Sequence, residues 1–287
     1  MNIQSILRRV AIKIISQPKA NVYVSINQVS SGKLLSNRTI VITGGSKGIG
    51  YSIAKRVISE GAKVIITGRN EEYLKNVITE LGTNADYIVY DNNNIDNIET
   101  IVTACKKKFG SIHSLVLNAG VSLHEGNFLN VTKEGFDLQF NTNLKANYFL
   151  AQRFLKDKLL EKTEGNLLFI SSETAGKSID IPYGLTKAAI NSLVGGLARR
   201  VYQKGIRVNA IAPGVTLTDM TAGGSKIDKS TDLGTDSIAG RWLLPEEIAE
   251  VVCFLLSDAS KCITGEVIYC DAGSHLKING TESEYSF

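Results

Sequence analysis

Short runs of apolar, mostly β-branched residues alternate along this chain with segments of helical periodicity. Residues 39–43, 63–67, 87–90 and 114–117 are such runs, whereas residues 51–58 repeat their apolar positions with the period of a helix. Strands that are apolar on both faces are typical of parallel sheets covered on both sides. The pattern therefore predicts an α/β fold with one domain, a doubly wound parallel sheet and helices on both faces.

The segment before this pattern, residues 1–35, has a periodicity of its own. It contains no acidic residue, since the first one in the chain is Glu60, and basic residues lie off its apolar stripe. Three interpretations stay open: a helix packed on its own subunit or a neighbour, a membrane-surface helix, and a mitochondrial-type targeting peptide. Residues 21–32 then alternate in a way that fits an added edge strand. The stripe consists of Ile3, Ile6, Leu7, Val10, Ala11, Ile14 and Ile15.

Composition narrows the function classes. The 287 residues carry a formal net charge of +4 with no concentrated basic stripe, which disfavours nucleic acid as a partner. The four cysteines lack metal-ligand spacing, so we expect reduced thiols and no metal site. No apolar stretch is long enough to span a bilayer. We expect a cytoplasmic protein, with peripheral membrane or mitochondrial location as the less favoured alternatives.

A glycine-rich loop follows the first predicted strand directly. Residues 44–50 read Gly-Gly-Ser-Lys-Gly-Ile-Gly, and a helical segment comes next. Glycines permit a tight turn and a close approach of the backbone to a ligand, while a helix N-terminus attracts the pyrophosphate of a dinucleotide. The loop therefore predicts dinucleotide binding through Gly44, Ser46, Lys47, Gly48, Ile49 and Gly50.

The end of the second strand indicates which dinucleotide binds. An acidic residue there would accept hydrogen bonds from a ribose 2′-hydroxyl and favour NAD, but the strand is followed by Arg69. Arg69 and Lys47 offer positive charge where a 2′-phosphate would lie. We therefore predict NADP as the cofactor, with NADPH preferred over NADH.

Tyr183 and Lys187 are one helical turn apart. At this spacing both side chains lie on one face of a helix. A cation beside a phenol favours phenolate and is expected to lower the pKa of the tyrosine, which could then exchange a proton with a carbonyl or alcohol oxygen. The pair alone fits either a general acid/base or a solvated helix face, and the motifs around it decide between the two.

Together these segments resemble the short-chain dehydrogenase/reductase family over residues 36–274, which implies a Rossmann-like fold. Asp91 resembles the aspartate that contacts adenine, and Asn143 the structural and proton-relay asparagine. Ser172 resembles the catalytic serine, although it lies closer to Tyr183 than the family usually places it, so Ser171 stays a possible substitute. The resemblance further implies cofactor contacts from Asn118, Ala119, Gly120, Tyr183, Lys187, Pro213, Gly214 and Thr218.

The family's mechanism assigns a role to each of four residues. Tyr183 would protonate the forming alkoxide, while Lys187 would lower its pKa and bind the nicotinamide ribose. Ser172 would orient the substrate carbonyl, and Asn143 would hold a water that links Lys187 to solvent. One departure is Asp271-Ala272-Gly273 where the family usually has Asp-Gly-Gly, a change expected to affect local packing.

The substrate is the least determined part. Residues 215–242 are rich in Gly, Ser, Thr and Asp and are expected to form a mobile lid, and residues 275–287 a C-terminal tail. Residues 241–249 resemble 3-oxoacyl-carrier-protein reductases, which makes a carrier-protein- or CoA-linked acyl group the leading substrate. The resemblance implies a homotetramer joined partly by the tyrosine helix. The alternative function is a catalytically silent NADP-binding regulatory or scaffold protein that uses its N-terminal extension.

Overall fold

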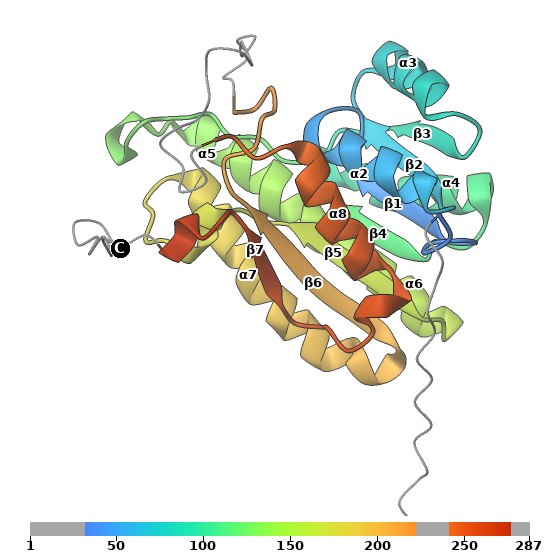
Figure 1. The fold of residues 1–287 in the computed structure, drawn as a ribbon. Helices are drawn as coiled ribbons and strands as arrows, with labels where there is room; N and C mark the ends of the chain where they lie inside the picture. Colours follow the sequence, from blue (N-terminus) through green and yellow to red (C-terminus); the bar gives the residue numbers. More distant parts are fainter. Residues whose placement is uncertain (1–31, 222–240, 277–287) are drawn as a thin grey trace, which may run out of the picture.

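Seven short apolar segments form the strands of one parallel sheet (Figure 1). The computed structural model describes residues 32–221 and 241–276 of the chain. Every residue of the inner strands β1 and β6 is buried, as a sheet covered on both sides requires. The strands are β1 (Thr39–Thr43), β2 (Lys63–Gly68), β3 (Ala85–Val89), β4 (Ser114–Leu117), β5 (Gly165–Ile170), β6 (Ile206–Pro213) and β7 (Val267–Cys270).

The strand order is β3-β2-β1-β4-β5-β6-β7, and all neighbours are parallel. From β1 the chain moves outward through β2 and β3 and then returns to place β4 on the other side of β1. Val41 of β1 accordingly lies opposite both Ile65 of β2 and Leu115 of β4. Ligands of such sheets bind beyond the carboxyl ends of the strands at this reversal.

Helices cover both faces of the sheet, and successive residues of one strand serve opposite cores. Val41 packs with side chains of α4, α6 and α7, whereas Ile40 and Ile42 pack with those of α2, α3 and α8. The sheet is therefore buried between two apolar layers. The helices are α2 (Gly48–Ser59), α3 (Glu71–Leu81), α4 (Ile98–Phe109), α5 (Lys133–Gln139), α6 (Ala146–Glu161), α7 (Pro182–Val201) and α8 (Pro245–Leu256).

Two local features position helices at the carboxyl edge of the sheet. Helix α7 begins at Pro182, whose fixed φ suits the first helical position and whose missing N–H costs no hydrogen bond there. Between α5 and α6, residues Phe140–Lys145 form a π-helical turn that contains the buried Asn143. Turns of this kind occur frequently at functional sites.

Glu60, just after α2, fixes the entry of the chain into the domain. Its Oε2 accepts hydrogen bonds from the N–H groups of Gly32 (2.7 Å) and Leu34 (3.2 Å), and its Oε1 from Arg56 (2.7 Å). Burial by itself raises the pKa of Glu60, but these three donors outweigh it and the pKa is lowered. The carboxylate therefore attaches the segment that leads into β1 at the amino end of the sheet.

The predicted fold is confirmed, with shifts at the ends of elements. The strand expected over residues 87–90 is β3, which begins two residues earlier and ends before Tyr90. The helix expected over 51–58 already begins at Gly48. Most of the predicted extension and tail, and residues 222–240 of the predicted lid, lie outside the described residues. Among the described helices, none is long and apolar enough to cross a membrane.

Candidate active site and dinucleotide pocket

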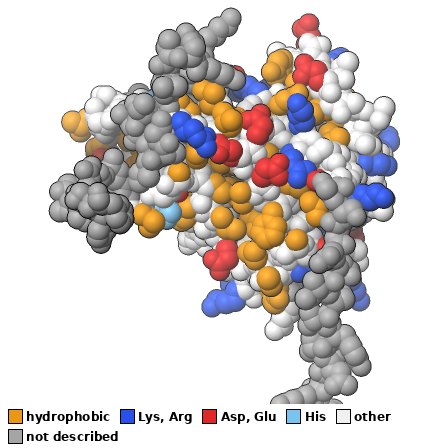
Figure 2. Space-filling view, viewed as in Figure 1, with side chains coloured by type: hydrophobic (Ala, Val, Ile, Leu, Met, Phe, Trp, Pro, Cys, Tyr) orange, Lys and Arg blue, Asp and Glu red, His pale blue; other side chains and the backbone are white. Residues whose placement is uncertain are grey.

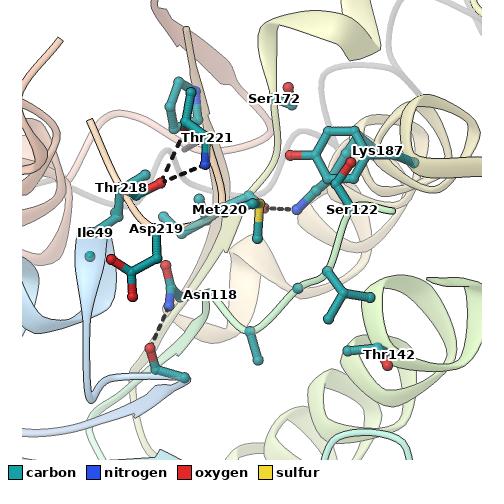
Figure 3. A pocket seen from close by; sticks show the side chains of 18 of the residues that line it. Ile49, Asn118, Ser122, Thr142, Ser172, Lys187, Thr218, Asp219, Met220 and Thr221 are labelled. Atoms are coloured by element: carbon teal, nitrogen blue, oxygen red, sulfur yellow. Dashed lines mark hydrogen bonds between the residues drawn. The ribbon is translucent and has the colours of Figure 1, made fainter. Parts of the chain in front are cut away.

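A pocket with a volume of about 590 Å³ lies at the carboxyl ends of the strands, where the strand order reverses. All predicted site residues line it except Gly50 and Asn143, which lie just behind its wall. Figure 3 shows Ser172 and Lys187 on one side of the pocket and Thr218, Asp219 and Met220 on a segment that crosses it. The pocket thus brings together residues that are far apart in the sequence. They follow β1, β4 and β5, belong to α7, or lie in the segment after β6.

The loop between β1 and α2 needs glycine for two different reasons. Gly44 and Gly48 have positive φ angles of 64° and 54°, a conformation that other residues rarely adopt. Gly50 has an ordinary φ, but a Cβ there would lie 2.4 Å from the carbonyl oxygen of Gly44 and 2.5 Å from Nδ2 of Asn118. Gly50 therefore contributes by letting the loop pack tightly, while Gly44 and Gly48 turn it.

The N-terminus of α2 opens toward the pocket without a side-chain cap. Lys47 at the N-cap position makes no capping hydrogen bond, and the first turn contains no acidic residue. Uncapped N–H groups and the helix dipole form an anion-binding site. Together with the side-chain-free cradle of Gly44 and Gly48, this arrangement fits the pyrophosphate of a dinucleotide.

Asn118 joins the end of β4 to the glycine loop. Its Nδ2 donates to the carbonyl oxygens of Thr43 and Gly44, both at 3.0 Å. The backbone N–H groups of Asn118 and Ala119 in turn donate to Oγ1 of Thr43, also at 3.0 Å. Six polar atoms are therefore satisfied within the protein, so the contribution of Asn118 is to shape the loop.

The far end of the pocket carries the residues expected to select the nucleotide. Arg69 and Asp91 line the pocket and are exposed, and Asp91 Oδ1 accepts from the N–H of Asn93 at 2.9 Å. Within residues 32–221 and 241–276 no ion pair involves Arg69. Lys47 instead pairs with Asp219, its Nζ 2.9 Å from Oδ2. Sequence reasoning missed Asp219, because nothing in the sequence signals that the segment after β6 folds back over the glycine loop.

Tyr183 and Lys187 lie together, as their spacing predicts, but the expected pKa direction for the tyrosine is wrong in this structure. Burial raises the pKa of Tyr183, and Glu173 adds to the rise, whereas a hydrogen bond with Ser172 opposes it. The Nζ of Lys187 lies 5.6 Å from the centroid of the tyrosine ring and donates to the carbonyl oxygen of Ile170 at 2.7 Å. Burial lowers the pKa of Lys187 to about 8.

The two serines at the end of β5 have different surroundings. Ser171 donates to Oδ1 of Asn191 at 2.6 Å, so its proton is directed into α7. Ser172 Oγ accepts from both the N–H and the hydroxyl of Thr174, at 3.3 and 3.0 Å, and it is the serine that contacts Tyr183. This geometry favours Ser172 over Ser171 as the serine that faces a substrate.

Asn143 binds the chain that follows Gly120. Its side chain exchanges two hydrogen bonds of 2.8 Å with the backbone of Val121, and the residue has no exposed surface. A Cβ on Gly120 would lie 3.3 Å from Oδ1 of Asn143 and 3.6 Å from Nζ of Lys187. The glycine thus leaves room between the amide and the ammonium group, although the two do not bond directly.

The segment after β6 crosses the pocket. Pro213 ends β6, the N–H of Gly214 donates to Cys270 (3.0 Å), and Thr216 forms a bridge with Leu243. Thr218 packs against the glycine loop, since its Cγ2 would lie 3.2 Å from a Cβ on Gly48. On the opposite wall, Nε2 of His124 lies 2.9 Å from the carbonyl oxygen of Met220. His124, to which the sequence assigns no role, therefore helps to hold this segment in place.

The departure at Asp271-Ala272-Gly273 affects local structure. Ala272 has a φ of 53°, a conformation that glycine tolerates better. Buried Asp271 accepts from the N–H of Gly273 (3.0 Å) and from the N–H and Nδ1 of His275 (2.7 and 2.8 Å).

No group of three or more His, Cys, Asp or Glu side chains in the described ranges could hold a metal ion.

Known proteins are similar to this chain in sequence. The model of the family described as enoyl-(acyl carrier protein) reductase matches residues 44–275. The 3-oxoacyl-[acyl-carrier-protein] reductase of Rickettsia bellii is 34% identical over 246 residues, 83% of this chain and 97% of that protein. The L-rhamnose 1-dehydrogenase (NADP(+)) of Thermoplasma acidophilum is 32% identical over 250 residues, 84% of this chain and 97% of that protein.

A solved structure agrees with these matches. The 3-ketoacyl-(acyl-carrier-protein) reductase of Brucella melitensis, complexed with NADH, superposes with a TM-score of 0.74 and 29% identity, over 84% of this chain and 99% of that one. The family match covers most of the chain and includes the glycine loop, the tyrosine helix and the strands between them. This chain therefore belongs to the short-chain dehydrogenase/reductase family and is an oxidoreductase of alcohol or carbonyl groups.

Proposed function

We propose that this enzyme reduces a carbonyl group to a secondary alcohol with NADPH, or catalyses the reverse reaction, with Tyr183 as the general acid/base. The observation that carries the proposal is the convergence of Ser172, Tyr183 and Lys187 on the pocket whose other end is formed by the glycine loop and the N-terminus of α2. When bound, NADPH supplies the hydride that adds to the carbonyl carbon.

Ser172 orients the substrate. A hydroxyl group has one proton and two acceptor sites, and both acceptor sites of Ser172 face donors of Thr174. Without substrate its proton is directed at the hydroxyl oxygen of Tyr183, and a substrate carbonyl oxygen bound between the two hydroxyl groups would accept it instead, which stabilises the negative charge that develops. Tyr183 donates its own proton to the same oxygen, which completes the alcohol and leaves a tyrosinate.

Lys187 and Asn143 support the proton transfer. The ammonium group of Lys187 uses one of its three protons on Ile170, so two remain for a ribose hydroxyl and for a water. Its positive charge stabilises the tyrosinate until a proton returns from solvent. Asn143 and the space beside Gly120 would hold the water that connects Lys187 to solvent.

The cofactor preference rests on Arg69 and Lys47. Both line the pocket, no acidic residue takes the position of Arg69, and a guanidinium binds phosphate through several charge-assisted hydrogen bonds. The ion pair with Asp219 reduces what Lys47 can offer, so Arg69 carries most of the preference. The remaining contacts to the dinucleotide come from Gly44, Ser46, Ile49, Asp91, Ala119, Pro213, Gly214 and Thr218.

The relatives leave the substrate class open between acyl thioesters and sugars. A 3-oxoacyl-carrier-protein reductase of Salmonella typhimurium and the rhamnose dehydrogenase are both 32% identical to this chain. Residues 241–249 resemble the corresponding segment of 3-oxoacyl-carrier-protein reductases, and this resemblance favours a thioester substrate. Cytoplasmic location follows the same analogy and stays a prediction.

We also propose a homotetramer. Gly195 and Gly196 of α7 are exposed, and a Cβ at either position would meet no atom within 4 Å. Tyr148 and Phe149 of α6 and Leu185 of α7 add exposed apolar surface. Figure 2 shows further apolar side chains on the face that carries α8 and β7. Burial of such surface against other copies would stabilise the assembly.

One assay tests the proposed chemistry. Purified protein is offered NADPH or NADH with thioester, sugar, quinone and steroid carbonyls, and Tyr183→Phe serves as the control. We expect turnover with NADPH that the variant loses while it still binds NADPH. Substantial activity of the variant would contradict the role of Tyr183. Tight NADPH binding without turnover of any of these carbonyl classes would favour the alternative, a catalytically silent scaffold protein. A protein that lacks residues 1–30 would then be tested for loss of binding to a partner or to a membrane.

A further inference from the structure

Glu173 is a buried carboxylate at the reacting end of the pocket. It follows Ser172 directly, opens the 3₁₀ turn Glu173–Gly176, lines the pocket and is only 7% exposed. Burial raises the pKa of Tyr183 most, and the negative charge of Glu173 raises it further. The charge of Glu173 therefore acts on the phenol. The mechanism proposed above makes no use of this group.

The two oxygens of Glu173 are not equivalent. Oε1 faces Lys177, whose Nζ is 3.5 Å away and whose side chain is 42% exposed at the surface. Oε2 is buried, and none of the described residues gives it a hydrogen bond. Carboxylate oxygens accept and never donate, and a buried acceptor without a donor costs free energy. A group that enters the pocket and donates to Oε2 is therefore favoured.

Charge decides which donor fits. Lys177 already offsets the single negative charge of Glu173, so a second cation would leave an excess positive charge in a half-closed pocket. An anionic substrate would place like charges side by side at low dielectric. A neutral hydroxyl group avoids both penalties and supplies the proton that Oε2 lacks.

We propose that Glu173 binds a hydroxyl group on a carbon close to the reacting carbonyl, so that the substrates are hydroxylated ketones or sugars. The proposal rests on the proposed function, because it uses the position of Glu173 beside Ser172 and Tyr183. It separates the two substrate classes that the relatives leave open. A 3-oxoacyl thioester carries no hydrogen-bond donor on the carbons next to its ketone, so it would leave Oε2 unsatisfied.

The test compares two ketones of the same shape. Acetoin carries a hydroxyl group beside its carbonyl, and methyl isopropyl ketone carries a methyl group at that position. We expect kcat/KM with NADPH to favour acetoin about tenfold or more, the range of a hydrogen bond to a charged group. Glu173→Ala should reduce this ratio about tenfold, to the intrinsic difference in reactivity between the two ketones, and Glu173→Gln, which keeps an acceptor oxygen, should retain part of the preference.

The ratio isolates substrate recognition, because any change in the pKa of Tyr183 affects both ketones equally. Exposed Glu134 on α5 supplies the matched control, since Glu134→Ala removes a carboxylate away from the pocket and should leave the ratio unchanged. Thermal unfolding confirms that each variant is folded, and Glu173→Gln gives the answer if Glu173→Ala does not fold.

The outcomes separate this inference from the proposed function. Equal kcat/KM for the two ketones, or a ratio that Glu173→Ala leaves intact, overturns the role of Glu173 while the reductase activity stands. Better turnover of acetoacetyl-N-acetylcysteamine than of acetoin overturns it as well. Absence of any NADPH-dependent turnover overturns the proposed function. Calorimetric titration of both ketones into the Tyr183→Phe protein with NADPH measures the preference without turnover, and equal affinities there also contradict the inference.

Discussion

Thr174 donates twice to Ser172: its N–H and its hydroxyl both reach the same Oγ, at 3.3 and 3.0 Å. The pair fixes the direction of the serine proton, because the acceptor side of the oxygen is occupied. Preorganised donors of this kind stabilise developing charge without reorganisation during the reaction.

The first prediction concerns this pair. Ser172→Ala should lower kcat about 100-fold or more, as the loss of one preorganised donor does, with little change in NADPH affinity. Thr174→Val keeps the shape but removes the hydroxyl donor, so a loss of about tenfold is expected. Ser171→Ala is the matched control and should act mainly on stability. Steady-state kinetics of the three variants check the ranking, and a larger kcat loss in Ser171→Ala would reverse the assignment.

The second prediction concerns Arg69. Arg69→Ala should raise the Kd of NADPH about tenfold or more and leave that of NADH nearly unchanged, because only NADPH carries the 2′-phosphate. Fluorescence titration of both cofactors measures the two constants. Lys47→Ala should have the smaller effect, since Lys47 shares its charge with Asp219. Equal losses for both cofactors in Arg69→Ala would remove Arg69 from the specificity site.

The third prediction follows from the pKa of Lys187, which burial lowers to about 8 from 10.5. A lysine with a lowered folded pKa opposes folding fully below pH 8, and the penalty fades as pH rises to 10.5. The penalty is on the order of 3 kcal/mol at pH 7, partly offset by the hydrogen bond to Ile170. Lys187→Met should therefore be inactive but more stable at pH 7.

Chemical denaturation of both proteins at several pH values checks this sign. The advantage of Lys187→Met should shrink between pH 8 and 10.5 and be absent above that range. A variant that is less stable than the native protein at pH 7 would show that the hydrogen bond to Ile170 outweighs the burial of charge.

The fourth prediction concerns backbone strain at Ala272, whose φ is 53°. Ala272→Gly should stabilise the protein by about 0.5–1 kcal/mol, because glycine adopts this conformation without the steric cost. Gly273→Ala, at a φ of 85°, is the opposite control and should destabilise by about 1 kcal/mol or more. Urea denaturation midpoints measure both changes.

The fifth prediction distinguishes a tetramer from a monomer through α7. In a single chain, Gly195→Ala and Gly196→Ala should stabilise the helix by about 1 kcal/mol each, because a Cβ meets open space at both positions. If another copy packs there closely, Gly196→Leu should instead break the assembly. Multi-angle light scattering on native and variant protein decides between these outcomes, and a monomeric native protein would contradict the proposal.

The sequence predicts the fold and the composition of the pocket well, because both follow from local patterns. Apolar runs, the glycine loop and the Tyr183–Lys187 spacing each act over a few residues. What escapes prediction depends on segments that meet only after folding. Asp219 pairs with Lys47 across a long stretch of chain, and the free oxygen of Glu173 shows only when its neighbours are in place. The expected lowering of the pKa of Tyr183 is wrong for the same reason, since burial of the phenol and the charge of Glu173 raise that pKa and outweigh the hydrogen bond with Ser172.

The attachment of Gly32 and Leu34 to Glu60 has a practical consequence. These residues lie at the amino end of the sheet, and the pocket lies at its carboxyl end. A linker, surface or neighbouring structure joined ahead of Gly32 would thus hold the enzyme at the amino end of the sheet. The mouth of the pocket would then face away from the point of attachment. Immobilisation through that end should leave diffusion of substrate into the pocket unobstructed.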